Sequence, residues 1–151
     1  MPPAGCEMSD AETLMRKVCA AFEKGDLQPL LDSLHPEIVW KAASTQPGLF
    51  RFSGKYEHRA GVRDVTSQIA MDYTFHRFSP REIVAKGDVV WGLFDAEIGY
   101  QPRAGKDTSK HAILEIAIRW QLKDGKILEH QAFFDTASLL AQQGQSVELL
   151  S

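Results

Sequence analysis

Three side chains in this sequence of 151 residues have the types and spacing that acid–base chemistry needs: Asp95, Glu97 and His130. Asp95 and Glu97 alternate along a predicted strand, so both side chains point to one face of it. Two carboxylates in a dry pocket raise one another's pKa and supply an acid and a base near neutral pH. His130, facing them, would carry protons, and a buried carboxylate would raise its pKa. These three residues are the predicted catalytic set.

A structural interpretation of the same residues stays open. The other face of the strand that carries Asp95 and Glu97 is more uniformly apolar, with Val90 and Phe94 among its residues. An apolar face is typical of the side that packs inward, which would leave the two acids in solvent. His130 equally fits a core histidine that is satisfied by a backbone carbonyl.

Five further residues are predicted to line a ligand pocket. Ala132 and Phe134 share the strand face of His130, and the small side chain of Ala132 leaves room for a ligand. Phe22 lies on the sheet-facing side of the first predicted helix, and the tryptophans Trp40 and Trp91 complete the set. Packing in the core is the alternative role for these aromatic residues.

Two other groups of polar residues have structural interpretations. Glu115 and Arg119 share a strand face, which indicates an ion pair on the outer face of the sheet or at a dimer interface more than a catalytic pair. Asp135 stands where a strand gives way to a helix, so its carboxylate is predicted to cap that helix.

The predicted secondary structure that positions these residues changes along the chain from helices to strands. Helical periodicity comes first, and strict alternation follows Tyr73, which predicts one α+β domain. The predicted helices run from the Ser9–Glu12 capping box to Lys24, then Leu27–Leu34, Ala60–Tyr73 and Ala137–Gln143. The predicted strands are one that begins at Ile38, then Phe75–Phe78, Arg81–Lys86, Val89–Tyr100, Lys110–Leu122 and Ile127–Phe134, with residues 42–58 as a loop or lid.

Composition narrows the function classes. Hydrophobic residues make up 44% and charged residues 25% of the chain, as in ordinary globular domains, and the net charge of -3 argues against nucleic acid and anionic membranes as partners. No cofactor-binding, metal-binding or phosphate-loop motif occurs, so no cofactor and no metal are expected. The sequence shows no apolar run long enough to span a membrane and no signal-peptide pattern, so we expect a cytoplasmic protein. The expected organisation is a leader over residues 1–9, a domain over 10–142 and a tail over 143–151.

Three segments in a fixed order resemble a known family. They are Lys24–Leu27, Lys86–Val90 and above all Lys123–Ala137, which reads KDGKILEHQAFFDTA. Over residues 10 to 142 the chain resembles the nuclear transport factor 2-like superfamily, in its SnoaL-like, ketosteroid-isomerase-related branch. The resemblance implies a cystatin-like, cone-shaped α+β barrel of three to four helices on a strongly curved, mostly antiparallel sheet. It also implies an apolar pocket and a homodimer formed through the outer face of the sheet.

The catalytic residues of that family are replaced in this chain. Where the resemblance would place a tyrosine and three aspartates, the chain has Val18, Ala42, Ala117 and Ala132. We therefore expect no ordinary steroid-isomerase activity. One hypothesis is a cofactor-independent isomerase, cyclase or hydrolase that acts on a small apolar molecule through a different acid–base set. The other is a non-catalytic ligand-binding or accessory dimer on the same scaffold.

Overall fold

The computed structural model describes residues 9–42, 50–100 and 110–143. The predicted leader up to residue 8, residues 43–49 of the predicted lid and the tail from residue 144 lie outside the described residues. The helices are α1 (Asp10–Glu23), α2 (Gln28–Asp32), α3 (His58–Asp72) and α4 (Thr136–Gln142). The strands are β1 (Leu34–Ala42), β2 (Gly54–Glu57), β3 (Tyr73–Lys86), β4 (Val89–Tyr100), β5 (Lys110–Lys123) and β6 (Lys126–Phe133).

Helix α1 begins as the capping box predicts. The Ser9 side chain accepts a hydrogen bond from the backbone N–H of Glu12 at 3.1 Å, which satisfies one of the free donors of the first turn. The helix buries Met15 and Val18 against the sheet and ends before Gly25, whose φ of 82° an L side chain would adopt only under strain.

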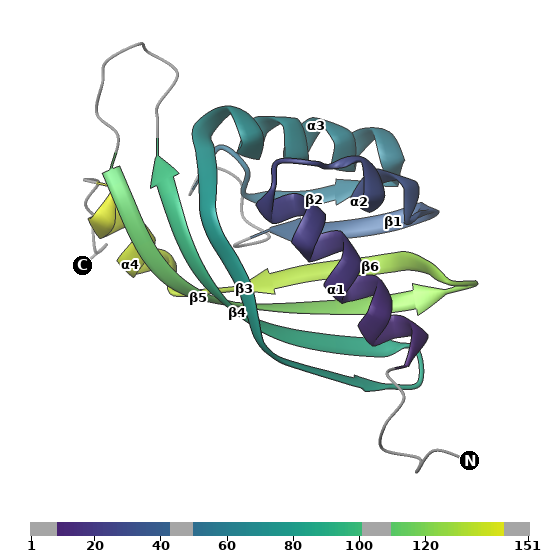
Figure 1. Cartoon of the computed structure of the whole chain (residues 1–151). Coiled ribbons are helices and arrows are strands. Elements are labelled where there is room, and N and C mark those ends of the chain that lie inside the picture. Colours follow the sequence, from purple (N-terminus) through teal and green to yellow (C-terminus); the bar gives the residue numbers. More distant parts are fainter. Residues whose placement is uncertain (1–8, 43–49, 101–109, 144–151) are drawn as a thin grey trace, which may run out of the picture.

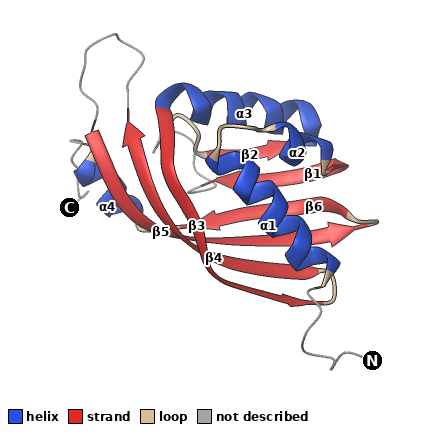
Figure 2. Ribbon diagram, viewed as in Figure 1, coloured by secondary structure: helices blue, strands red, loops and turns tan. Residues whose placement is uncertain are grey.

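The six strands form one sheet in the order β2-β1-β6-β5-β4-β3. Strands β1 and β6 pair in parallel, and the other neighbours pair in antiparallel fashion. The sheet bends around α1, and α3 covers the end formed by β1 and β2 (Figure 1). This confirms the predicted α+β fold with a curved, mostly antiparallel sheet (Figure 2). The sheet does not close into a barrel, since β2 and β3 are its two edges.

The concave face of β4 carries the apolar side chains. Val90, Phe94, Ala96 and Ile98 are buried, and Gly92 sits among them. A Cβ atom on Gly92 would lie 2.8 Å from Sδ of Met15 and 2.6 Å from Cε2 of Phe94, closer than packed atoms approach. Glycine at this position therefore allows α1 to lie directly on the sheet.

Two segments differ from the sequence-based prediction. Strand β3 is continuous from Tyr73 to Lys86, where two strands were predicted. Its register with β4 shifts near Pro80, and as an edge strand it tolerates a proline that donates no ladder hydrogen bond. Strand β1 begins at Leu34 and β2 lies inside the predicted loop, because their pairing with each other depends on contacts that a local pattern does not contain.

No helix of the described residues has the length and hydropathy of a membrane span.

Candidate functional site

A cavity of about 110 Å³ lies between the concave face of the sheet and the helices. Five of the predicted pocket residues line it: Phe22 from α1, Trp40 from β1, His130 and Ala132 from β6, and Phe134 just after β6. Val18, which stands where the family places a tyrosine, also lines the cavity. The wall is almost entirely apolar, so it offers a ligand dispersion contacts and burial of its apolar surface.

Three aromatic rings cross the cavity wall in one row. Trp40 is opposite His130 in the β1–β6 register, and His130 is opposite Trp120 in the β5–β6 register. The rings of Trp40 and His130 stack with centroids 3.5 Å apart and planes 7° from parallel. On the other side, Nε1 of Trp120 donates a hydrogen bond to Nδ1 of His130 at 2.9 Å. Strand register thus holds the imidazole between two indoles.

This environment keeps His130 neutral. An Nδ1 atom that accepts a hydrogen bond carries no proton, so the proton of the neutral ring is assigned to Nε2. Burial lowers the pKa of His130 to about 3, because a charged imidazolium would be stripped of water there. The hypothesis of a raised pKa from a facing carboxylate is therefore wrong, and His130 is a core histidine whose partner is an indole.

The other titratable groups of the wall are also uncharged near neutral pH. Burial raises the pKa of the Cys19 thiol and of the Tyr73 hydroxyl. The Tyr73 hydroxyl donates to Oε1 of Gln143 at 3.0 Å. No Asp, Glu, Lys or Arg among the described residues lines the cavity.

Asp95 and Glu97 lie on the opposite face of the sheet, which corrects their predicted place in the pocket. Asp95 forms an ion pair with Arg81, whose hydrogen bonds hold the pKa of that carboxyl below its usual range. Glu97 is exposed. The physical reason is the alternation in β4: the neighbouring residues Phe94, Ala96 and Ile98 take the concave face, so the acids point outward. The structure does not bring the two acids together with His130.

Trp91 also lies outside the cavity. It shares the outer face with Asp95, is 43% exposed and stacks on Phe133 with ring centroids 6.0 Å apart. The prediction that Trp91 lines the pocket is wrong for the same reason of alternation in β4.

The charged residues of the outer face pair differently from the prediction. Glu115 bonds to Arg81 at 2.9 Å, and Arg119 bonds to Glu129 at 3.1 Å, so Glu115 and Arg119 are not partners. Cross-strand neighbours replace the same-strand pairing that the sequence suggested. The capping role of Asp135 is confirmed, since its carboxylate accepts the backbone N–H of Ser138 at 2.9 Å.

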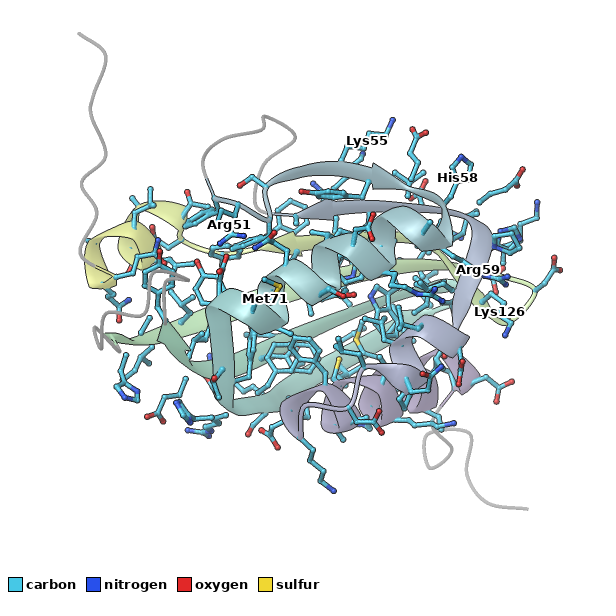
Figure 3. The ribbon with its side chains drawn as sticks, turned by 90° about the horizontal axis from the view of Figure 1, so that it is seen from above. Arg51, Lys55, His58, Arg59, Met71 and Lys126 are labelled. Atoms are coloured by element: carbon cyan, nitrogen blue, oxygen red, sulfur yellow. The ribbon has the colours of Figure 1, made fainter. Side chains whose placement is uncertain are left out.

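The sequence-based reasoning missed one buried acid and several cavity residues, among them Cys19, Tyr73 and Trp120. Asp72 is 3% exposed, bonds to Arg51 at 3.0 Å and to Gln68 at 3.2 Å, and is the only buried carboxylate in the described part of the chain. It does not line the cavity, and Arg51, labelled in Figure 3, balances its charge at the surface beside α3. Tyr73 lines the cavity, and the available signal was its place where helical periodicity gives way to alternation. Over the described residues, no three His, Cys, Asp or Glu side chains converge as metal ligands.

Comparison with known proteins agrees with this fold. A model of the SnoaL-like domain matches residues 15–130. An NTF2-like protein of unknown function from Burkholderia pseudomallei is similar in structure, with a TM-score of 0.77 and 18% identity over 91% of this chain and 99% of that one. An NTF2-like protein from Burkholderia thailandensis has a TM-score of 0.73 and 23% identity over 91% of this chain and 99% of that one.

TerC, co-crystallised with polyporic acid, has a TM-score of 0.73 and 21% identity over 89% of this chain and 98% of that one. The TM-scores show that this chain shares the fold of these structures. No curated protein matches the sequence significantly. The NTF2-like structures share the fold of this chain, and because the SnoaL-like model covers most of the chain, the protein belongs to the SnoaL-like domain family.

Proposed function

We propose that this protein binds a small, neutral and largely apolar molecule in its cavity and carries out no chemistry on it. The observation that carries the proposal is the uncharged wall. Cys19, Tyr73 and His130, the titratable residues that line it within the described part of the chain, are all neutral near pH 7. A charged ligand would lose its water there without gaining a counter-ion. An apolar ligand has no bound hydration shell of that strength to lose, so its burial in the cavity is favourable.

The size of the cavity limits the ligand. In another protein, a dry apolar cavity of roughly 150 Å³ binds benzene. A cavity of about 110 Å³ therefore suits a molecule with a single ring. The co-crystal of the similar protein TerC with polyporic acid supports a ligand-binding role for this scaffold.

An enzyme that works without a cofactor is the second candidate. Membership of the SnoaL-like family favours it, together with the Tyr73 hydroxyl and the His130 ring in the cavity wall. Proton transfer, however, needs a base matched to the working pH. An imidazole with a pKa of about 3 accepts a proton poorly, and the buried Asp72 is already paired with Arg51. These features favour binding over catalysis.

Calorimetric titration with toluene tests the binding proposal. We expect saturable binding to the unaltered protein and at least about tenfold weaker binding to Ala132→Leu, because the larger side chain fills space that the ligand needs. Ala70→Leu is the matched control, since Ala70 is exposed on α3 and the same atoms are added there. If toluene does not bind, or if both variants bind it equally, the cavity is not the site. Mass spectrometry of the recovered ligand would separate binding from turnover.

We also propose a homodimer that buries the outer face of the sheet. Four large apolar residues are exposed on the described strands β3 to β6: Val84 at 55%, Trp91 at 43%, Ile113 at 75% and Phe133 at 44%. Trp91 and Phe133 lie in contact on neighbouring rows of that face. Val84 is opposite Trp91 in the β3–β4 register, so Val84, Trp91 and Phe133 form one apolar cluster, and Ile113 lies apart from it, opposite Glu97. Exposed apolar side chains that cluster in this way favour coverage by another protein surface.

A further inference from the structure

Two histidines that lie far apart in the sequence meet on the outer face of the sheet. His76 belongs to β3 and His111 to β5, and their ring centroids are 5.2 Å apart with planes 30° from parallel. Both residues are exposed, and neither imidazole forms a hydrogen bond or an ion pair within the described part of the chain. A neutral imidazole carries one nitrogen with a lone pair, so each ring can offer a ligand atom.

Gly99 makes this contact across a whole strand possible. It lies on β4 between the two histidines, directly opposite His111 in the β4–β5 register. Nε2 of His76 lies 2.9 Å from the place where a Cβ atom on residue 99 would stand, so a side chain there would displace the His76 ring. Because Cβ atoms of cross-strand partners are about 4.5–5.5 Å apart, this nitrogen is within reach of the His111 imidazole.

We propose that His76 and His111 together bind one late first-row transition-metal ion such as Zn²⁺ or Cu²⁺, through one ring nitrogen each. With Zn–N distances of about 2.0–2.1 Å, two imidazoles at a tetrahedral angle on one ion have ring centroids about 5 Å apart. The observed separation of 5.2 Å matches this value. Imidazole nitrogen suits these ions, whereas Ca²⁺ and Mg²⁺ need oxygen ligands. Gly99 and Trp91 stand near opposite ends of β4, so the site is separate from the apolar cluster of the proposed dimer.

The charges around the pair are compatible with a bound cation. Glu97 is exposed on the same face of β4, two residues before Gly99 and hence about 7 Å along the strand, and its negative charge attracts a cation. Nε of Arg77, the residue after His76, donates to Oγ of Ser79 at 3.3 Å. Since no group of three His, Cys, Asp or Glu side chains converges in the described residues, water fills the remaining positions of the ion, which makes it exchangeable.

Titration with ZnCl₂ in a buffer that does not bind metals tests the site, followed by calorimetry and by imidazole ¹⁵N shifts. We expect one saturable Zn²⁺ per chain, with the signals of His76 and His111 moving together. CuCl₂ should bind more tightly and MgCl₂ should not bind. His76→Gln and His111→Gln should each weaken Zn²⁺ binding at least about tenfold, because the second imidazole acts at a high effective concentration. His58→Gln is the matched control, an exposed histidine on α3, and should keep the affinity within about twofold.

Gly99→Ala tests the geometry without removing a ligand. Its methyl group would displace Nε2 of His76, so Zn²⁺ binding should weaken at least about fivefold, since the orientation of the ligands governs metal affinity. Absence of saturable Zn²⁺ binding to the unaltered protein would overturn the proposal. Equal weakening by His58→Gln, or ¹⁵N signals of all exposed histidines that move alike, would also overturn it, because the ion would then bind single imidazoles. The ¹⁵N shifts are read in the unaltered protein, so the test stands even if a variant does not fold.

Discussion

The Nε1–H of Trp120 donates a hydrogen bond to Nδ1 of His130 at 2.9 Å, between two residues directly opposite each other on β5 and β6. This bond satisfies two buried polar groups at once and makes the imidazole an acceptor at that position. It explains how a histidine occupies an apolar wall without a charge. It also places the proton of the neutral ring on Nε2.

The first prediction concerns the titration of His130. Its pKa is 6.5 in an unfolded chain and about 3 in the folded protein, so between these values the unfolded state binds the extra proton. The contribution of His130 to stability is therefore complete above pH 6.5 and is lost as the pH falls toward 3. The free energy of unfolding should drop by up to about 1.4 kcal/mol per pH unit in this window.

Urea unfolding at pH 4 to 7 measures this slope, with His130→Phe as the comparison. The variant leaves the Trp120 donor unpaired and is expected to be less stable overall, but its pH slope should be shallower. Imidazole ¹⁵N shifts that titrate near pH 6.5 in the folded protein would contradict the prediction.

The second prediction is that Asp95→Asn combined with Glu97→Gln leaves the site unchanged. Both acids lie on the outer face, and Asp95 bonds to Arg81 rather than to any cavity residue. Toluene affinity should stay within about twofold, as expected for distant and independent sites. The ¹⁵N shifts of His130 should also be unchanged. A change in either quantity would show that these carboxylates act on the cavity.

The third prediction concerns the contact between α1 and the sheet. Gly92→Ala should destabilise the fold by about 1–3 kcal/mol, because the new methyl group overlaps Phe94 and Met15. Gly61→Ala is the matched control: in α3 its Cβ would lie 3.6 Å from Cβ of Tyr56, an ordinary contact, and a helix gains up to about 1 kcal/mol from alanine. Thermal or urea unfolding of the two variants measures both effects. Equal stability of the two variants would mean that α1 lies further from β4.

The fourth prediction is that Trp91→Glu yields a monomer. A charge in the apolar cluster of the outer face would have to be desolvated in the proposed dimer. Ser67→Glu, an exposed position on α3 with the same change in charge, should leave the dimer intact. Sedimentation analysis at micromolar concentration distinguishes the two. A monomeric unaltered protein would refute the dimer.

Local patterns were sufficient for much of this fold. The capping box at Ser9 and the cap at Asp135 were readable because they involve residues three apart in the chain. Alternation along β4 was readable because successive side chains of a strand point to opposite faces. Alternation separates two faces, but it does not say which one a helix covers. The packing of α1 over Gly92 decides that, and it sends Asp95 outward.

The sequence by itself determined the class of fold, the helices and most of the strands, and the presence of His130 and Trp40 on apolar strand faces. Only the tertiary structure decided that these two rings stack, because their contact depends on the parallel register of β1 and β6, whose paired residues are 90 positions apart in the chain. The same register and its antiparallel neighbour place Trp120 beside His130, and Nε1 of Trp40 has no hydrogen-bond partner among the described residues. Pairing over such distances follows from the whole core rather than from any local pattern, and here it makes the predicted proton carrier a neutral ring in the cavity wall.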